Sequence, residues 1–170
     1  MSNYERILSI LDTDGIAYNL IEHPESHSCE ESKEFRDAAG LTGVGSKNIV
    51  FHAKGKFYLV TTIAEKSIKA RNFKHEFGTK DIRFASQEEI TGAFDATIGS
   101  IPPFGFSNVE IPIYVDAEIF GSEYFIFNPS IATKSLRLKT VDLHRAYEKL
   151  SNPVKFFRVG EESFELLETL

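Results

Sequence analysis

A lysine follows two glycines at the start of a run of β-forming residues. Lys47 stands in the segment Gly43-Val44-Gly45-Ser46-Lys47-Asn48-Ile49-Val50-Phe51. Glycines before a strand let a backbone approach a ligand closely, and a lysine there can present a point charge to a cleft. Because lysines are mostly exposed, the alternative is a solvated residue at a strand end, which this local pattern by itself favours.

A second segment combines two glycines with two consecutive prolines: Gly99-Ser100-Ile101-Pro102-Pro103-Phe104-Gly105. Proline restricts the backbone and glycine extends its range, so the amide groups of this loop can be held in one orientation. Such amides suit recognition of a carbonyl oxygen or stabilisation of an oxyanion. A structural turn between two elements is the alternative, and it is the simpler interpretation of this segment alone.

Basic side chains are concentrated between residues 66 and 80. We expect Lys66, Lys69 and Arg71 to flank a cleft and contact phosphate, although a solvated face explains the same charges equally well. The run consists of Lys66, Lys69, Arg71, Lys74, His75 and Lys80.

The remaining reactive residues form no recognised metal or nucleophile pattern. The five histidines lack HExxH or comparable spacing, and Pro24 opposes a helix that would bring His23 and His27 together. Cys29 lies at an expected helix start, where a thiolate would be stabilised, but no partner base is evident. Walker, GxGxxG and GxSxG motifs are absent from the sequence. We expect neither a metal nor a cofactor.

The composition predicts a single-domain, soluble, cytoplasmic protein. The chain has 170 residues, of which 42% are hydrophobic and 26% charged, and its single cysteine rules out an internal disulfide. No apolar run approaches the roughly 20 residues of a membrane span, and the first residues lack the order of a signal peptide. Fifteen phenylalanines and no tryptophan predict a Phe-rich core.

The net charge of −6 limits the nucleic-acid partners that the chain can have. Phosphate neutralisation dominates the affinity of proteins that wrap nucleic acid, so these proteins usually carry a basic excess. The charge therefore argues against a broad duplex binder, but not against an enzyme that touches one terminal nucleotide through a local basic patch.

The elements that must position these residues alternate between helical and strand patterns. Helices are expected at 4–14, 28–39, 66–77, 86–94 and 140–150, with Ser28/Glu31 and Ser86/Glu89 as capping boxes. A hairpin joins 48–52 to 57–62, and further strands are expected at 17–22, 82–84, 111–115, 123–127 and 134–138. Because βαβ regularity is missing, the pattern predicts an α+β fold around a largely antiparallel sheet.

Taken in order, several of these segments resemble one family. They are His23-Pro24, Ser28-Cys29-Glu30-Glu31, Ser46-Lys47-Asn48, Arg83-Phe84-Ala85-Ser86, the GxxxPFG segment from Gly99 to Gly105, and Phe127-Asn128-Pro129 ahead of Thr133. The combination resembles the YbaK family of trans-editing proteins, which is related to the editing domain of bacterial prolyl-tRNA synthetases. The resemblance covers about residues 4–150. It implies an editing domain at 1–150, with a curved mixed sheet and packed helices. Residues 151–170 lie outside the resemblance as a C-terminal extension, in which the alternating pattern on either side of Gly160 predicts a hairpin.

The resemblance also implies an activity and a partner. Members of the family hydrolyse the ester between a mischarged amino acid and the terminal adenosine of tRNA, so the acceptor end of aminoacyl-tRNA is the implied partner, with prolyl-tRNA synthetase as a second candidate. Lys47 would contact the adenosine phosphate or the carbonyl end, and the backbone of Gly99 would hold the ester carbonyl or the attacking water. The implied substrate-binding residues are Ser100, Pro103, Phe104, Gly105, Asn128 and Thr133.

The sequence departs from the family pattern where the amino acid would be recognised. Family members that edit alanine carry a histidine where this chain has Asn128, and often an asparagine where it has Ala132. Specificity for alanine therefore does not carry over, and we expect Asn128, with Ile49 and Phe51 if they line the pocket, to select the side chain. A module that binds a tRNA end without hydrolysis, or a protein that docks on a synthetase, are the alternatives to an enzyme.

Overall fold

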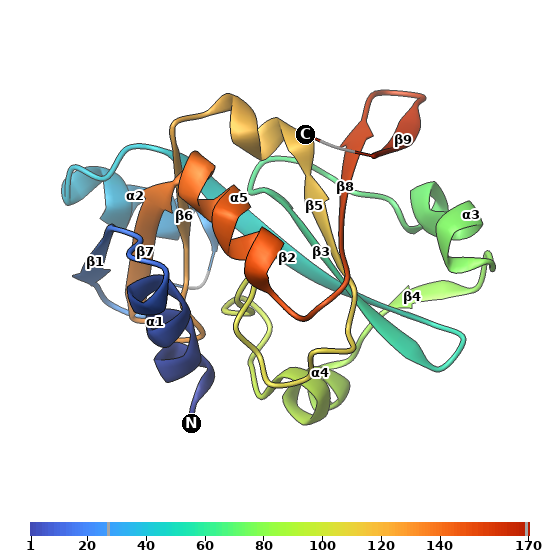
Figure 1. Ribbon diagram of the computed structural model, residues 1–170, viewed down its shortest axis with the longest axis horizontal. Coiled ribbons are helices and arrows are strands. Elements are labelled where there is room, and N and C mark those ends of the chain that lie inside the picture. Colours follow the sequence, from blue (N-terminus) through green and yellow to red (C-terminus); the bar gives the residue numbers. More distant parts are fainter. Residues whose placement is uncertain (27, 169) are drawn as a thin grey trace.

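A nine-stranded mixed sheet forms the centre of the molecule (Figure 1). The protein is represented by a computed structural model that describes residues 1–26, 28–168 and 170. The strands are β1 (Tyr18–Glu22), β2 (Val44–Ala53), β3 (Lys56–Ile63), β4 (Ile82–Phe84), β5 (Ile113–Asp116), β6 (Tyr124–Phe127), β7 (Lys134–Lys139), β8 (Val154–Val159) and β9 (Phe164–Leu167). The helices are α1 (Asn3–Thr13), α2 (Cys29–Ala38), α3 (Lys74–Phe77), α4 (Gln87–Phe94) and α5 (Thr140–Lys149), with 3₁₀ turns η1 (Ala70–Phe73) and η2 (Ala117–Gly121).

The strands lie in the order β1-β7-β6-β2-β3-β5-β8-β9, and β4 pairs with β2 outside this path. Three neighbouring pairs, β2–β6, β3–β5 and β5–β8, are parallel, and the other five pairs are antiparallel. Helix α5 crosses one face of the sheet, and α1 lies beside it (Figure 1). The predicted α+β class with a mixed, largely antiparallel sheet is confirmed.

Local signals place the starts of α2 and α4 where the sequence predicts them. The Ser86 hydroxyl accepts from the Glu89 backbone and the Glu89 carboxylate accepts from the Ser86 backbone, which forms a complete capping box. Ser28 accepts from the Glu31 backbone at the start of α2. Because the hydrogen bonds that start α4 join residues three apart in the sequence, the local sequence is sufficient to predict where this helix begins.

Strand β2 lacks a neighbour along part of one edge. It pairs with β6 only at Val44 and Gly45, and with β4 only from Phe51 to Ala53, whereas its β3 edge is paired continuously from Ser46 onward. In the described part of the chain, no strand therefore pairs with the other edge of residues 46–49. At about 3.3 Å per residue this opening is about 13 Å long.

Phenylalanines fill two hydrophobic clusters, as the composition predicts. The larger cluster contains Ile7, Phe104 and Phe127, and the smaller one groups Phe51 and Phe73 with other aromatic side chains. Phe51, Phe73, Phe104 and Phe127 are completely buried. Burial of such side chains is the main favourable contribution to folding.

The expected helix at 66–77 is wrong in its first part. Residues 66–69 are not helical, and only η1 and the short α3 follow. The Lys66 carbonyl accepts a hydrogen bond from Lys47, and its ammonium is paired with Asp116. These long-range contacts fix an open backbone at Lys66 and override the local helical spacing.

The tail after residue 150 extends the sheet. Strand β8 pairs in parallel with β5, and β9 returns antiparallel to β8. Phe157 in β8 is completely buried in the smaller cluster. The division into a domain at 1–150 and an extension at 151–170 stays a prediction. Separately, none of the helices in the described ranges is long and apolar enough to cross a membrane.

We expect Gly105→Ala to lower the free energy of unfolding by about 2–4 kcal/mol, as measured by urea denaturation. Gly105 has a φ of 92°, and an added Cβ would lie 2.4 Å from Cγ1 of Ile7, so backbone strain and overpacking combine. Gly15→Ala is the matched control, because Gly15 has a φ of 65° with open space around it and should cost about 1 kcal/mol. Equal losses in the two variants would contradict the packing argument.

Candidate active site

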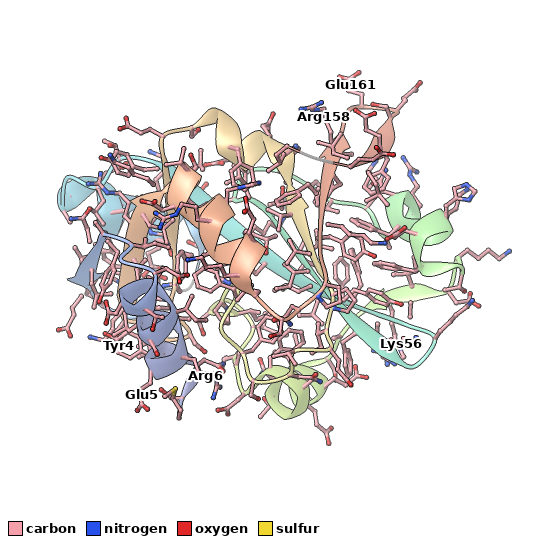
Figure 2. All side chains as sticks on the ribbon, viewed as in Figure 1. Tyr4, Glu5, Arg6, Lys56, Arg158 and Glu161 are labelled. Carbon is pink, nitrogen blue, oxygen red and sulfur yellow. The ribbon has the colours of Figure 1, made fainter. Side chains whose placement is uncertain are left out.

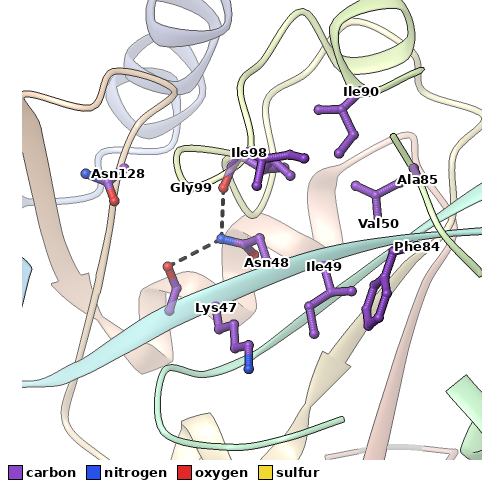
Figure 3. A pocket seen from close by; sticks show the side chains of 12 residues that line it. Lys47, Asn48, Ile49, Val50, Phe84, Ala85, Ile90, Ile98, Gly99 and Asn128 are labelled. Carbon is purple, nitrogen blue, oxygen red and sulfur yellow. Dashed lines mark hydrogen bonds between the residues drawn. The ribbon is translucent and has the colours of Figure 1, made fainter. Parts of the chain in front are cut away.

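A cavity of about 420 Å³ lies along the unpaired edge of β2 (Figure 3). Asn128, just after β6, lies at one end of this opening, and Phe84, at the end of β4, lies at the other. We call this cavity the apolar chamber, since most of its lining side chains are hydrophobic. Its lining residues are Ser46, Lys47, Asn48, Ile49, Val50, Phe84, Ala85, Ile90, Ile98, Gly99, Ile101 and Asn128.

A second cavity, of about 560 Å³, adjoins the first. Ser46, Ile98, Gly99 and Asn128 line both, so these four residues form a ridge between them. We call the second cavity the polar chamber. Its remaining lining residues are Glu25, Ser26, Ser28, Ser32, Arg36, Ala64, Thr97, Ser100, Ser130 and Ala132.

Lys47 is half-buried, and its ammonium donates to the Lys66 carbonyl at 3.1 Å. Side chains alternate between the two faces of a strand, so Lys47 and Ile49 share one face of β2, whereas Asn48 points to the other. Figure 3 shows this alternation, with Gly99 on the Asn48 side. Lys47 and Gly99 therefore line one cavity from opposite faces of the strand.

The side chain of Asn48 connects β2 to the glycine–proline loop. Its amide nitrogen donates to the Ile101 carbonyl at 2.9 Å, and its oxygen accepts from the Thr61 hydroxyl at 2.8 Å (Figure 3 shows the loop side). These bonds hold the loop at a fixed height above the open edge of β2. Asn48 thereby orients the backbone of Gly99 relative to the strand.

Gly99 is the exposed member of the loop. Its φ is 97°, and an added Cβ would meet no heavy atom within 4 Å, so its backbone faces open space. Ser100 is buried, and its backbone N–H donates to Thr97 at 2.9 Å. The loop therefore presents Gly99 at the ridge between the chambers and anchors itself through Ser100.

Residues 102–105 of the loop lie in the core and line neither chamber. Phe104 is completely buried against Phe127 and Tyr147. The Pro103 carbonyl accepts from the Tyr147 hydroxyl at 3.3 Å, and the Gly105 carbonyl accepts from Nε of Arg6 at 2.8 Å. This placement gives no support to the expectation that Pro103, Phe104 and Gly105 contact substrate. They instead anchor the loop that carries Gly99.

The two candidates after β6 are placed differently. Asn128 lines both chambers, and its amide donates to the Lys134 carbonyl at 2.8 Å. Thr133 is exposed and lines neither chamber, while its carbonyl accepts from the His23 backbone at 2.9 Å. Ala132 lines the polar chamber, so the neighbour of Thr133, and not Thr133 itself, reaches the cavity.

Lys66 is held by an acidic pair. Its ammonium lies 2.7 Å from Oδ2 of Asp116, which is completely buried, and 3.2 Å from Oε2 of Glu118. The Thr62 hydroxyl donates to the same Asp116 oxygen at 2.7 Å. Burial opposes the charge of Lys66, but these two carboxylates outweigh it and raise the pKa of the ammonium. The Lys66 ammonium is thus paired with carboxylates of the protein itself, while the Lys66 carbonyl accepts a hydrogen bond from the Lys47 ammonium.

The other two basic candidates lie outside both chambers. Lys69 is exposed at the start of η1. Arg71 lines a separate cavity of about 510 Å³ between η1–α3 and the terminal hairpin. Of these three residues, the structure places Lys66 beside Lys47, with its ammonium paired to Asp116 and Glu118, whereas Lys69 and Arg71 lie elsewhere.

Sequence reasoning missed several apolar residues of the site. Phe84 is 64% exposed and Ile98 is 56% exposed, although both are large hydrophobic residues in a cavity lining. Ile49 lines the apolar chamber as expected, whereas Phe51 is buried beneath Phe84, with ring centroids 5.3 Å apart. Nothing in the local pattern separated the exposed Phe84 from the many core phenylalanines.

The residues considered for metal binding give no centre. Among the described residues, no group of three or more His, Cys, Asp or Glu side chains could hold an ion. The His23 ring stacks on Phe35, and its Nε2 lies 2.9 Å from the Ser135 hydroxyl. His27 and the side chain of Cys29 lie outside what the structure describes.

We expect Asp116→Asn to lower the free energy of unfolding by about 1.5–3 kcal/mol at neutral pH, because hydrogen bonds to a buried charge are lost. Glu118→Gln is the matched control, since the Glu118 side chain is 62% exposed and its pair with Lys66 should contribute less than about 1 kcal/mol. Urea denaturation of both variants measures the difference. A larger loss in Glu118→Gln would show that the buried pair does not hold this region.

Known proteins with the same architecture align with this chain over nearly its whole length. A crystal structure described as that of a proposed trans-editing enzyme for prolyl tRNA synthetase superposes with a TM-score of 0.72 at 22% identity, covering 94% of this chain and 99% of that one. The Prolyl-tRNA editing protein ProX of Acetoanaerobium sticklandii is 24% identical over 91% of this chain and 96% of its own length. The Multifunctional Ser/Thr-tRNA deacylase ProXp-y of Escherichia coli is 26% identical over 84% of this chain and 86% of its own.

Shorter matches occur in synthetases. A 49-residue segment, 29% of this chain, is 51% identical to a part of the proline–tRNA ligase of Shouchella clausii, and it corresponds to 8% of that enzyme. The family model described as the aminoacyl-tRNA editing domain matches residues 23–146, which include Lys47, Gly99 and Asn128. The chain therefore belongs to the aminoacyl-tRNA editing domain family.

Proposed function

We propose that this protein is an aminoacyl-tRNA deacylase that hydrolyses the ester of a mischarged tRNA in trans. The observation that carries the proposal is the meeting of Lys47 and Gly99 at one cavity, beside the open edge of β2, in a chain of the editing family. Relatives of similar length are named as a prolyl-tRNA editing protein and as a Ser/Thr-tRNA deacylase, and both names describe this kind of proofreading.

The reaction needs no side-chain nucleophile. A water molecule adds to the ester carbonyl carbon, the bond from that carbon to the ribose oxygen breaks, and a proton passes to the departing ribose oxygen. The products are the free amino acid and tRNA with its terminal hydroxyl restored. Because an aminoacyl ester is already reactive, positioning and stabilisation of the developing oxyanion can supply the acceleration.

We assign the two central residues to different parts of the substrate. The exposed Gly99 backbone would hold the ester carbonyl or the attacking water at the ridge between the chambers. Lys47 projects from the opposite face of β2, so its ammonium is better placed for the phosphate of the terminal nucleotide than for the carbonyl. Asn128, at the ridge, would contact the aminoacyl group. Ser100 supports Gly99 through the loop.

The location and the partner follow from the same activity. Mischarged tRNA is produced by synthetases in the cytoplasm, so we place the protein there. The segment shared with a proline–tRNA ligase makes prolyl-tRNA synthetase the partner of first choice and tRNA for proline the first tRNA to examine. The amino acids to examine are alanine and cysteine, together with the serine and threonine named for the relative.

A module that binds the tRNA end without hydrolysis is the second candidate. The net charge of −6 disfavours a dedicated tRNA-binding factor, because phosphate contacts supply most of such affinity. Binding of mischarged tRNA by the wild type without release of amino acid would favour this module.

We expect Lys47→Ala to slow release of the amino acid at least 100-fold in a panel of alanyl-, cysteinyl-, seryl- and threonyl-tRNA. The reason is loss of the only charged side chain among the described residues that line the apolar chamber. Lys56→Ala is the matched control, because Lys56 is an exposed lysine at the far end of the same β2–β3 hairpin (Figure 2).

Circular dichroism should show that both variants stay folded. Full activity in Lys47→Ala would remove this lysine from the catalytic site. Absence of release from every member of the panel by the wild type would count against the deacylase itself.

A further inference from the structure

An exposed aromatic ring marks one end of the apolar chamber. Phe84 is 64% exposed, yet it is held in place by stacking on the completely buried Phe51, with centroids 5.3 Å apart and planes at 26°. Ile98, 56% exposed, lines the same chamber from the loop. A rigid exposed ring at a cavity is a stacking platform for a flat ligand.

The charged residues that line the two chambers differ, and they favour different parts of the substrate. Among the described lining residues of the apolar chamber, Lys47 is the only charged one and carboxylates are missing. The positive α-ammonium of an aminoacyl group is therefore disfavoured there, whereas a phosphate is favoured. The polar chamber contains the Glu25 carboxylate and several hydroxyl groups, which suit an ammonium. Arg36 also lines it, and its Nε donates to the Ser135 hydroxyl at 3.0 Å.

Three side chains on one face of β2 and its neighbour β4 lie in the same order as the phosphate, ribose and base of the terminal nucleotide. Lys47 and Ile49 lie on one face of the strand, and Phe84 continues this face, because it is opposite Phe51 in the β2–β4 register. Figure 3 shows Lys47, Ile49 and Phe84 on the same side of β2. This row offers, in sequence, an ammonium, an aliphatic surface and an aromatic ring.

We infer that the apolar chamber is the adenosine subsite and that the adenine base of the terminal nucleotide stacks on Phe84. The inference rests on the proposed function. The phosphate then meets Lys47, the ester lies at Gly99 on the ridge, and the aminoacyl group enters the polar chamber beyond Asn128. Phe84 thus selects the nucleotide, and the polar chamber selects the amino acid.

The test separates nucleotide binding from hydrolysis. The first probe is adenosine 5′-monophosphate, whose binding is measured by calorimetry or NMR titration. We expect Phe84→Ala to weaken its binding about 10–100-fold, as for loss of a base–aromatic stack, and Phe84→Tyr to retain it. The second probe is mischarged tRNA ending in adenosine or in cytidine: the wild type should prefer adenosine through KM, and Phe84→Ala should lose that preference.

Ala132→Leu is the matched control in the other chamber. Ala132 lines only the polar chamber, so its enlargement should change which amino acid is released and leave binding of the monophosphate unaltered. Unchanged monophosphate binding in Phe84→Ala would overturn the inference. A change of amino-acid preference in Phe84→Ala, without loss of nucleotide binding, would overturn it too, because the apolar chamber would then hold the side chain.

Failure of the proposed function gives a different result. If the wild type binds the monophosphate through Phe84 but hydrolyses no mischarged tRNA, the result supports the adenosine subsite and contradicts the proposed deacylase activity. If the wild type hydrolyses mischarged tRNA while Phe84→Ala keeps the wild-type KM, the result supports the deacylase activity and contradicts the adenosine subsite.

Discussion

An interruption in the hydrogen-bonded sheet creates the site. Backbone groups in a sheet interior are normally paired on both edges of each strand, and β2 satisfies this rule at its two ends through β6 and β4. Between these ends, residues 46–49 have β3 as their neighbour and no strand on the other edge among the described residues. The opening lets side chains from both faces of β2 reach one cavity, so that Lys47 and Gly99 line the same cavity although they lie on opposite sides of the strand.

Two sets of polar contacts keep that opening in shape. Asn48 connects β2 to the Ile101 carbonyl and so holds the loop above the open edge. On the other face, buried Asp116 fixes Lys66, whose carbonyl receives the ammonium of Lys47. Buried polar groups that are fully bonded restrict the number of alternative arrangements, because any shift would leave one of them without a partner. The described part of the chain contains no buried side-chain nitrogen or oxygen without a hydrogen bond, in agreement with a site that is rigid before substrate arrives.

The arrangement of the chambers suits proofreading. A proofreading enzyme must accept the same nucleotide end from every tRNA and discriminate among amino acids. Separate chambers on either side of a shared ridge allow the two requirements to be met by different residues. Selection between side chains that differ by a methylene is limited to about 1–3 kcal/mol in an apolar pocket, whereas hydroxyl groups can be distinguished more strongly by hydrogen bonding. The serine-rich lining beyond Asn128 is therefore the part of the molecule in which differences between family members should be concentrated.

The sequence by itself determined the α+β class, most helix and strand positions and the family, because these depend on local periodicity, caps such as Ser86–Glu89 and short motifs around Lys47 and Gly99. It also indicated a Phe-rich core, but not which phenylalanine stays exposed. Only the tertiary structure decided that Phe84 faces a cavity, that Phe104 lies in the core, and that Lys66 serves Asp116 and interrupts the expected helix at 66–77. The physical reason is that exposure and ion pairing arise between residues far apart in sequence: Lys66 is 50 residues from Asp116 and Phe84 is 33 from Phe51, distances over which no local pattern carries information.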